Sequence, residues 1–441
     1  MKIFVIILAV LLILAGCGQQ PVETPTTVPT TVAQLKEFDV QINGAPVIAG
    51  MVSARLSEPL EEEPVYQWYL DGEPLPGACA DTVTLPVSAA GKALTVTAQA
   101  GGWTAESEPV TVEQTELEEY SMAAIFYDSK IYGRCTADAV FLTMDFSASG
   151  FEMTVEADGG DMVMSYIAGC DLYVAVFVDG KQVDRPLLNS GAGELKIKLS
   201  KGTHTVMVLK ETEVSTSGQA LNLLSMTFDG KILDKPADRD LYIEFIGDSI
   251  ACGDGSLGVY TAGEKWLLQD HSGTHGFAYL TAKNLDADWS VFARGGIGLM
   301  KPAGDYTAGQ IFSFMNRYRD SVTAYKPTRI PDVVVVELGA NDDKDDTAGF
   351  VAAYNDLVDQ IRGLYGEDVK IVWTGKNTNQ FKAAQYVAQQ REDANMYAFQ
   401  FAYGGSGSAA LTTQSSGHPS AEEQQLFANA LTSYLEKNVL N

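Results

Sequence analysis

The sequence is 441 residues long, with 46% hydrophobic and 20% charged residues, a composition that indicates a folded protein and excludes a largely disordered chain. Its 57 acidic and 30 basic residues give a formal net charge of −27, which disfavours nucleic acid and anionic membrane surfaces as partners. We therefore expect no nucleic-acid binding and a neutral partner, such as an uncharged glycan.

The N-terminus is typical of a bacterial lipoprotein precursor. An apolar run at residues 3–14 is too short to span a bilayer comfortably, and it leads into Leu-Ala-Gly-Cys at residues 14–17. These four residues resemble a lipobox, in which the cysteine is acylated after cleavage. We expect a signal peptide at 1–16, a lipid anchor on Cys17, and an extracytoplasmic protein that touches the membrane through this anchor only. The alternative is an ordinary signal peptide that ends near a cysteine.

A Pro- and Thr-rich linker at 17–36 precedes two stretches that predict antiparallel β-sandwiches. The first, 37–115, has short alternating segments and an Asp-Gly turn, and its Val-Tyr-Gln-Trp-Tyr segment resembles the tryptophan-bearing strand of immunoglobulin-like modules. We expect Trp68 in the core of this Ig-like module, with sugar binding as the alternative. In the second, 120–236, hydrophobic residues alternate along a strand that ends at another Asp-Gly hairpin signal.

The pattern changes at 238–441 to apolar strands followed by helical segments. The helix candidate 347–365 carries apolar residues along one face. Strands that alternate with helices imply an α/β domain with a parallel sheet covered on both sides, in a three-layer flavodoxin-like arrangement whose ligands bind at the carboxyl ends of the strands. The predicted strands are 241–246, 289–293, 333–338, 369–373 and 396–401.

Chemically useful residues follow these strands or lie in the last loop, and each also has a simpler explanation. Ser249 directly follows the first strand, where a turn exposes its hydroxyl, although serine also caps helices. Gly295 and Gly296 follow the second strand and let a backbone N–H approach a ligand, or simply form a turn. Asn341 follows the third strand and offers an amide donor, or caps a turn. His418 precedes a capping box at the last helix, and a solvated loop histidine is the alternative.

In this order, the segments around these residues resemble blocks one, two, three and five of the SGNH (GDSL-like) hydrolases. The resemblance implies a serine esterase in which Ser249 is the nucleophile and His418 the general base. It also implies that the oxyanion is held by the N–H groups of Ser249 and Gly296, with Gly295 as the fallback, and by the Asn341 amide. No metal or organic cofactor is implied.

The resemblance extends upstream to about residue 120. Tyr-Gly-Arg at 132–134, Phe-Val-Asp-Gly at 177–180, and Gly-Thr-His-Thr-Val at 202–206 running into Lys-Glu-Thr-Glu at 210–213 resemble the jelly-roll domain that precedes the SGNH domain in carbohydrate esterase family 2. That family implies an acetyl esterase acting on plant polysaccharides such as xylan and mannan.

One position departs from the general SGNH pattern. Ser415 stands three residues before His418, where these enzymes usually carry Asp. Some family 2 esterases lack that Asp and use a Ser-His dyad, with the imidazole oriented by a backbone carbonyl. We therefore expect a dyad rather than a full triad.

Further residues are candidates for the substrate site. Asp248 adjoins the nucleophile, Trp373 ends a predicted strand, and Trp266, His271 and His275 lie in the long segment after the nucleophile. Aromatic faces stack on pyranose rings, but core packing is the alternative for both tryptophans.

The sequence gives no sign of a metal site or a disulfide framework. The acidic run at 342–346 lacks the glycine and terminal glutamate of an EF-hand, so we expect a solvated helix start. The four remaining cysteines have neither disulfide-framework nor zinc-site spacing, and we expect free thiols. They are Cys79, Cys135, Cys170 and Cys252.

These observations predict a monomeric esterase that removes O-acetyl groups from a polysaccharide of the xylan or mannan type, through an acetyl-enzyme. Two alternatives remain open. One is an SGNH esterase acting on another acyl substrate, such as a lipid or a cell-wall glycan. The other is an inactive surface protein that binds a glycan.

Overall fold

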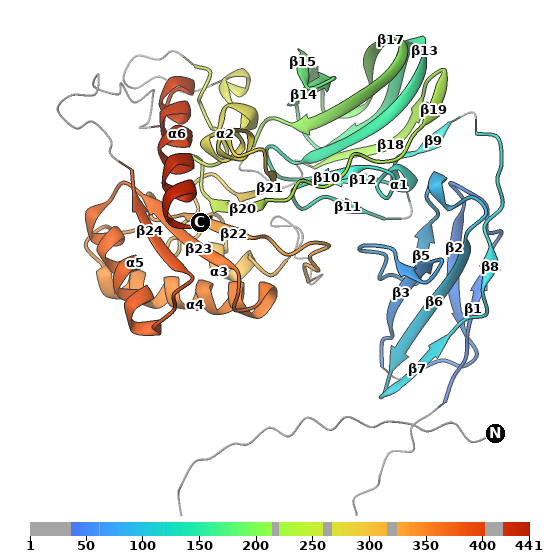
Figure 1. Cartoon of the computed structure of the whole chain (residues 1–441), viewed down its shortest axis with the longest axis horizontal. Coiled ribbons are helices and arrows are strands. Elements are labelled where there is room, and N and C mark those ends of the chain that lie inside the picture. The colour runs from blue at the N-terminus through green and yellow to red at the C-terminus, as the bar shows by residue number, and fades with distance from the viewer. Residues whose placement is uncertain are drawn as a thin grey trace, which may run out of the picture.

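The computed structural model shows two β-rich units followed by an α/β unit, so the predicted fold class is confirmed (Figure 1). The signal peptide, Cys17 and the linker at 17–36 lie outside the described residues. Among the residues described, no helix is long and apolar enough to cross a membrane. The structure describes residues 37–60, 62–117, 119–138, 140–213, 220–258, 267–314, 324–401 and 418–441.

The first unit consists of two small antiparallel sheets that share one apolar core. Trp68 is fully buried in this core, and its indole N–H donates to the Ala80 carbonyl at 2.9 Å. The Asp-Gly turn at 71–72 has positive φ at both residues, as a tight hairpin requires. A β-sandwich is therefore present, while its Ig-like topology stays a prediction. One sheet contains β1 (Val40–Asn43), β2 (Met51–Leu56) and β5 (Thr82–Thr84), and the other β3 (Val65–Leu70), β4 (Glu73–Pro74), β6 (Ala93–Ala100), β7 (Trp103–Glu106) and β8 (Val110–Thr111); a short 3-10 helix, η1, spans Val87–Ala89.

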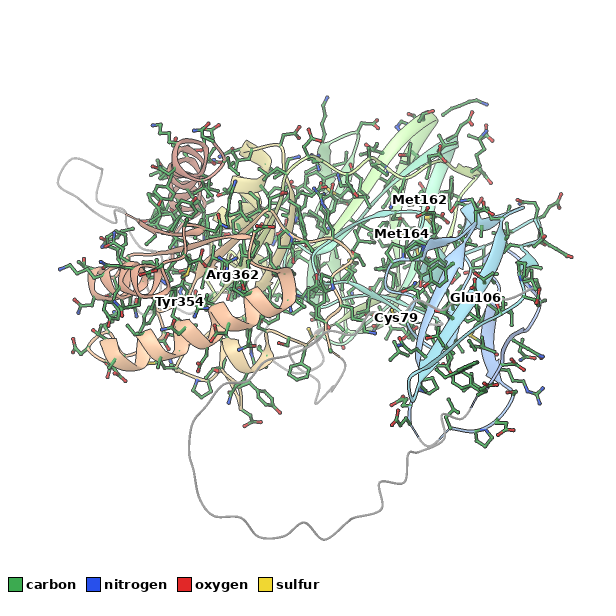
Figure 2. The ribbon with its side chains drawn as sticks, turned by 60° about the horizontal axis from the view of Figure 1, so that its bottom comes forward. Cys79, Glu106, Met162, Met164, Tyr354 and Arg362 are labelled. Atoms are coloured by element: carbon green, nitrogen blue, oxygen red, sulfur yellow. The ribbon has the colours of Figure 1, made fainter. Side chains whose placement is uncertain are left out.

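The second unit is built around two long strands, β13 (Gly150–Ala168) and β17 (Gly191–Lys210), which pair antiparallel along almost their whole length. Their inward side chains fill the core, and Figure 2 labels two of them, the fully buried Met162 and Met164. The predicted alternation and Asp-Gly hairpin are present in β14 (Leu172–Val178) and the turn after it. The other elements are β9 (Tyr120–Ser121), α1 (Met122–Ile125), β10 (Lys130–Tyr132), β11 (Thr136–Ala137), β12 (Leu142–Met144), β15 (Lys181–Asp184), β16 (Leu187–Leu188), β18 (Leu221–Thr227) and β19 (Gly230–Ile232).

The α/β unit has a five-stranded parallel sheet with the order β21-β20-β22-β23-β24. Each predicted strand is present within two residues of its expected bounds. Because all five strands run the same way, the loops that follow them gather at one edge, as expected for a ligand site. The strands are β20 (Tyr242–Gly247), β21 (Asp288–Ala293), β22 (Val333–Glu337), β23 (Lys370–Gly375) and β24 (Met396–Gln400).

Helices cover both faces of this sheet (Figure 1). On one face, α2 (Phe277–Asn284) and α6 (Ala421–Asn438) pack on alternate strand residues; on the other lie α3 (Ala308–Ile311), α4 (Thr347–Tyr365) and α5 (Thr378–Arg391). Figure 2 labels two buried residues of α4, Tyr354 and Arg362, and the guanidinium of Arg362 binds Asp393 at 2.7 Å. Two 3-10 helices, η2 (Leu268–Asp270) and η3 (Gly273–His275), precede α2.

The Tyr-Gly-Arg segment at 132–134 anchors the second unit in the α/β unit. The Tyr132 ring stacks on Trp289 with centroids 3.9 Å apart, and Gly133 N–H donates to the Trp289 carbonyl. Arg134 is buried inside the α/β unit, where it pairs with Glu244 at 3.2 Å and lies over the Phe292 ring. The two units therefore share a continuous core.

Candidate active site

Ser249 and His418 meet at the carboxyl edge of the sheet. His418 Nε2 lies 2.6 Å from Ser249 Oγ, a hydrogen-bond distance suited to proton transfer. Ser249 follows β20, and its residue is 7% exposed. The fold thus brings together a hydroxyl and an imidazole that are 169 positions apart in the sequence, which is the arrangement that a serine nucleophile and its base require.

The start of α6 holds His418 against the loop at 249–257, which carries Ser249 and is called the nucleophile loop below. Ser420 caps the helix and forms the predicted capping box with Glu423. Ala421 N–H donates to the Ser256 carbonyl, and the Gln424 amide donates to the Ile250 carbonyl at 3.0 Å. Because these bonds tie the helix to both ends of the loop, the position of the histidine is set by the helix.

The nucleophile loop differs from the expected strand-to-helix turn. Residues 249–257 form a succession of turns rather than a regular helix. The loop closes on itself, since Cys252 N–H donates to the Asp248 carbonyl and Asp254 N–H to that of Ser249. A Cβ at Gly253 would collide with the Ser272 carbonyl, so only glycine fits there.

Gly296 lies in a loop that Asp342 organises. Gly296 is partly exposed with φ +78°, whereas Gly295 is buried, so Gly296 is the better placed of the two to face a ligand. The buried Asp342 carboxylate accepts the N–H groups of Leu299, Met300 and Lys301 at 2.8–2.9 Å. It occupies the space that a side chain at position 298 would need.

This role corrects the expectation of a solvated acidic run. Asp342 is buried, and only the residues after it are exposed, with Asp346 capping α4 through Gly349 N–H at 2.8 Å. The sequence signal for Asp342 was its place directly after the oxyanion candidate Asn341.

The Asn341 amide is already engaged in this structure. Its Nδ2 donates to Asp248 Oδ2 at 3.0 Å and to the Ile297 carbonyl at 2.9 Å. The amide therefore bridges the nucleophile loop and the Gly296 loop. To bind an oxyanion, it must release one of these two acceptors.

Asp248 lies beneath the nucleophile, and its assignment to the substrate site is wrong. Its side chain is fully buried and accepts the Ile250 N–H at 2.9 Å as well as the Asn341 amide. Its carboxyl also contacts that of Glu337, the last residue of β22. Burial raises the pKa of Asp248 to about 7, with the nearby Asp254 adding to the shift. Burial and the adjacent Asp248 raise the pKa of Glu337 well above its usual range.

Trp373 also does not face a substrate. It is fully buried between the sheet and its helices, and its indole N–H donates to the Leu338 carbonyl at 3.2 Å. The core alternative is therefore the correct one. Trp266 and Ser415 lie outside the described residues.

His271 and His275 lie where the second unit meets the nucleophile loop. His271 Nδ1 is 2.8 Å from Asp254 Oδ1; burial lowers its pKa, the Asp254 carboxylate raises it, and the net shift is upward. His275 Nδ1 is 2.8 Å from Ser272 Oγ, and burial lowers its pKa. Both rings thus have protein partners at this interface.

The Lys-Glu-Thr-Glu segment at 210–213 of the second unit is almost completely buried against the same region. Glu211 accepts the Thr274 hydroxyl, and its carbonyl accepts the Gly273 N–H. Arg185 adds a further tie by donating to the His271 carbonyl at 2.5 Å. The second unit therefore braces the loop that carries the nucleophile.

Three potential metal ligands come together at this interface. Single ligand atoms of Glu213, Cys252 and Asp254 lie within 4.8 Å of one another. All three residues are buried and interact with other protein groups. All four described cysteines are free thiols, and burial raises the pKa of Cys135 to about 12.

A cavity of about 340 Å³ opens beside the nucleophile loop at the carboxyl ends of β22 and β23. Its walls are polar and apolar in similar measure, and Glu337 lies in its lining. The lining residues are Ile250, Glu337, Leu338, Gly339, Ala340, Lys344, Gly375, Lys376, Asn377, Thr378, Asn379 and Gln380.

Comparison with known proteins matches residues 245–421 to the GDSL-like lipase/acylhydrolase family. The chain is 29% identical over 229 residues to the cellulase/esterase CelE of Acetivibrio thermocellus, a match that covers 49% of this chain and only 27% of CelE. It is 26% identical over 309 residues to an acetylxylan esterase/glucomannan deacetylase of Cellvibrio japonicus, covering 65% of this chain and 81% of that protein.

A solved structure gives the same relationship over the second and third units. A family two carbohydrate esterase from Clostridium thermocellum, in complex with cellohexaose, is 26% identical with a TM-score of 0.63, and the match covers 70% of this chain and 98% of that chain. The α/β unit therefore matches the GDSL-like lipase/acylhydrolase family of ester hydrolases, and together with the β-rich unit before it the α/β unit resembles the two-domain architecture of family two carbohydrate esterases.

Proposed function

We propose that this protein is a serine esterase that removes O-acetyl groups from a polysaccharide of the xylan or mannan type. The observation that carries the proposal is the 2.6 Å contact between His418 Nε2 and Ser249 Oγ at the carboxyl edge of an esterase-family sheet. The relative from Cellvibrio japonicus that is named an acetylxylan esterase/glucomannan deacetylase supports the substrate class.

In this mechanism, His418 takes the hydroxyl proton of Ser249 as Oγ attacks the acetyl carbonyl carbon. The tetrahedral intermediate collapses, the sugar oxygen leaves with the proton from His418, and an acetyl-enzyme remains. Water activated by His418 then attacks the acetyl carbonyl, and Ser249 leaves with its proton restored. The products are acetate and the free sugar hydroxyl.

The oxyanion is held by the N–H groups of Ser249 and Gly296 and by the Asn341 amide. Asn341 donates to a charged acceptor, Asp248, and to a neutral one, the Ile297 carbonyl. Hydrogen bonds to charged partners are roughly twice as strong. The developing oxyanion therefore displaces Ile297, while the bond to Asp248 remains and orients the amide.

Acetate release from acetylated xylan, acetylated glucomannan and peptidoglycan, measured in parallel with hydrolysis of a long-chain ester, tests the substrate class. We expect turnover on the two plant polysaccharides and none on the long-chain ester. Preference for peptidoglycan or for the long-chain ester would replace this proposal with another acyl substrate. Binding without acetate release from any of them would indicate an inactive glycan-binding protein.

We further propose that the protein acts outside the cytoplasm as a monomer held to the membrane by a lipid on Cys17. The lipobox-like residues 14–17 and the linker after them support this location. Detergent partitioning of the wild type against Cys17→Ser is the test. Partition of the wild type into the aqueous phase, with cleavage at another position, would contradict it.

A further inference from the structure

The buried contact between the carboxyl groups of Asp248 and Glu337 lies directly under the proposed catalytic centre. Glu337 is paired with Gly247 across the β20–β22 register, so its side chain lies next to the residue that precedes the nucleophile. Asp248 is fully buried and Glu337 is 4% exposed. Two ionised carboxylates in contact at such a site would repel each other strongly.

The hydrogen bonds of the pair show where a proton fits. Asp248 accepts two donors, the Ile250 N–H and the Asn341 amide, and is therefore suited to the ionised state. Glu337 Oε2 is buried and receives no donor from the described residues. A proton on Glu337 resolves this situation, because the acid then donates to the Asp248 carboxylate and no buried oxygen is left unsatisfied.

We propose that Glu337 is held as the protonated member of this pair and that, through Asp248, it positions the Asn341 amide for the oxyanion. Glu337 is a positioning residue, since it acts on the proposed esterase reaction through two other side chains. Its protonation leaves the pair itself with a single negative charge.

The charges around the pair favour this state. The carboxylates of Asp254 and Asp342 both raise the pKa of Asp248 by electrostatic repulsion, so they disfavour a further negative charge on the pair. A hydrogen bond from the Asp248 backbone and the charge of Lys376 lower the pKa of Glu337, yet the net shift is strongly upward because of burial and the Asp248 carboxyl. His418, on Ser249, is a further titratable group at this edge. Loss of the last proton of the pair at high pH would add a charge that opposes oxyanion formation.

Replacing Glu337 by glutamine or methionine separates positioning from packing. Glu337→Gln keeps a neutral donor at the same place, so we expect kcat close to that of the wild type. Glu337→Met fills similar space without donating, and a misoriented Asn341 should lower kcat by about tenfold to a hundredfold with little change in KM. Above neutral pH, wild-type kcat should decline as Glu337 ionises, whereas Glu337→Gln should keep its activity. Equal damage in both variants, or the same alkaline decline in both wild type and Glu337→Gln, would overturn the proposal.

The proton can also be observed without any substrate. Infrared difference spectroscopy of the unliganded protein at neutral pH, before the alkaline decline begins, should show the carbonyl band of a buried protonated carboxyl in the wild type and not in Glu337→Gln. This readout keeps the inference distinct from the proposed esterase function on which its kinetic arm rests. An esterase that lacks the band would contradict the shared proton alone, and a protein with the band but no turnover would contradict the esterase function.

Discussion

Glu244 and Glu337 are buried acids on neighbouring central strands of one sheet, and the protein compensates their charges in opposite ways. Glu244 lies in β20, where Arg134 approaches at 3.2 Å and the Tyr365 hydroxyl donates at 2.6 Å. Glu337 ends β22 against a second carboxyl, Asp248. A buried acid that is paired with a cation and accepts a hydroxyl donor can stabilise the contact between two units. A buried acid next to another acid is unfavourable unless the two share a proton. Glu244 thus belongs to the contact between two units, which we call the interface end. Glu337 lies beside the proposed catalytic residues at the carboxyl edge, which we call the chemical end.

The largest expected effect lies at the carboxyl edge. Ser249→Ala removes the attacking oxygen, and His418→Ala removes its base, so each should lower kcat on an aryl acetate by about four to six orders of magnitude. Because neither side chain supports the core, the thermal midpoint should barely move. The double variant should be no worse than either single one. Turnover close to the wild type in purified Ser249→Ala would end the assignment.

A substitution at the interface end should lower the free energy of unfolding rather than kcat. Arg134→Met leaves Glu244 buried without its cation, which should cost about 3–5 kcal/mol of unfolding free energy. Chemical denaturation measures this change, and kcat per folded molecule should remain near the wild-type value. Lys201→Met, which breaks an exposed ion pair with Asp158, is the matched control and should leave the midpoint unchanged. A stable Arg134→Met protein with lost activity would reverse the proposed division between the two ends.

A substitution of Asp342 tests whether an acid at the chemical end affects kcat only by fixing the conformation of the Gly296 loop. Asp342→Asn keeps the size of the side chain but turns an amide group toward the three N–H donors, so the Gly296 loop should shift. We expect kcat to fall by about tenfold to a hundredfold, with KM less affected. Asp345→Asn, in the exposed part of the same acidic run, is the control and should behave as the wild type. If both variants kept full activity, the Gly296 loop would not depend on the Asp342 carboxylate.

The comparison also explains what the sequence could and could not predict. The strands of the α/β unit were predictable to within two residues because the hydrophobic period, the strand length and the flanking turns agree, and α4 has the expected bounds. The Ser249–His418 pairing was implied by the resemblance to the SGNH hydrolases, and the contact lies at the sheet edge where loops after parallel strands meet. Element patterns alone do not reveal pairings such as Arg134 with Glu244 or Asp248 with Glu337, because these pairings depend on which side chains face each other across strands and domains.

The assignments of Trp373 and Asp248 to the substrate site are wrong for a related reason: position along the sequence does not show which way a side chain points. Trp373 was predicted at a strand end, but β23 continues to Gly375, and the Trp373 side chain is fully buried in the core. Asp248 adjoins the nucleophile in sequence, yet the turn after β20 directs the two side chains to different surroundings. Neighbouring residues at the end of a strand point to opposite faces, so adjacency in sequence is poor evidence for a shared substrate site.

The smallest effect is expected at Ser415, which stands where an aspartate would complete a triad. Loss of the aspartate from a true triad costs roughly four orders of magnitude. In a dyad, that orientation must already come from elsewhere, for example from a backbone carbonyl. Ser415→Ala should therefore change kcat less than about tenfold, and its pH profile should coincide with that of the wild type and of a neighbouring control, Ser416→Ala. Activity in all three should rise through the ordinary pKa of an imidazole, about 6.5, as the base loses its proton. Abolished activity in Ser415→Ala, or a distant Asp or Glu as essential as His418, would replace the dyad with a relocated triad.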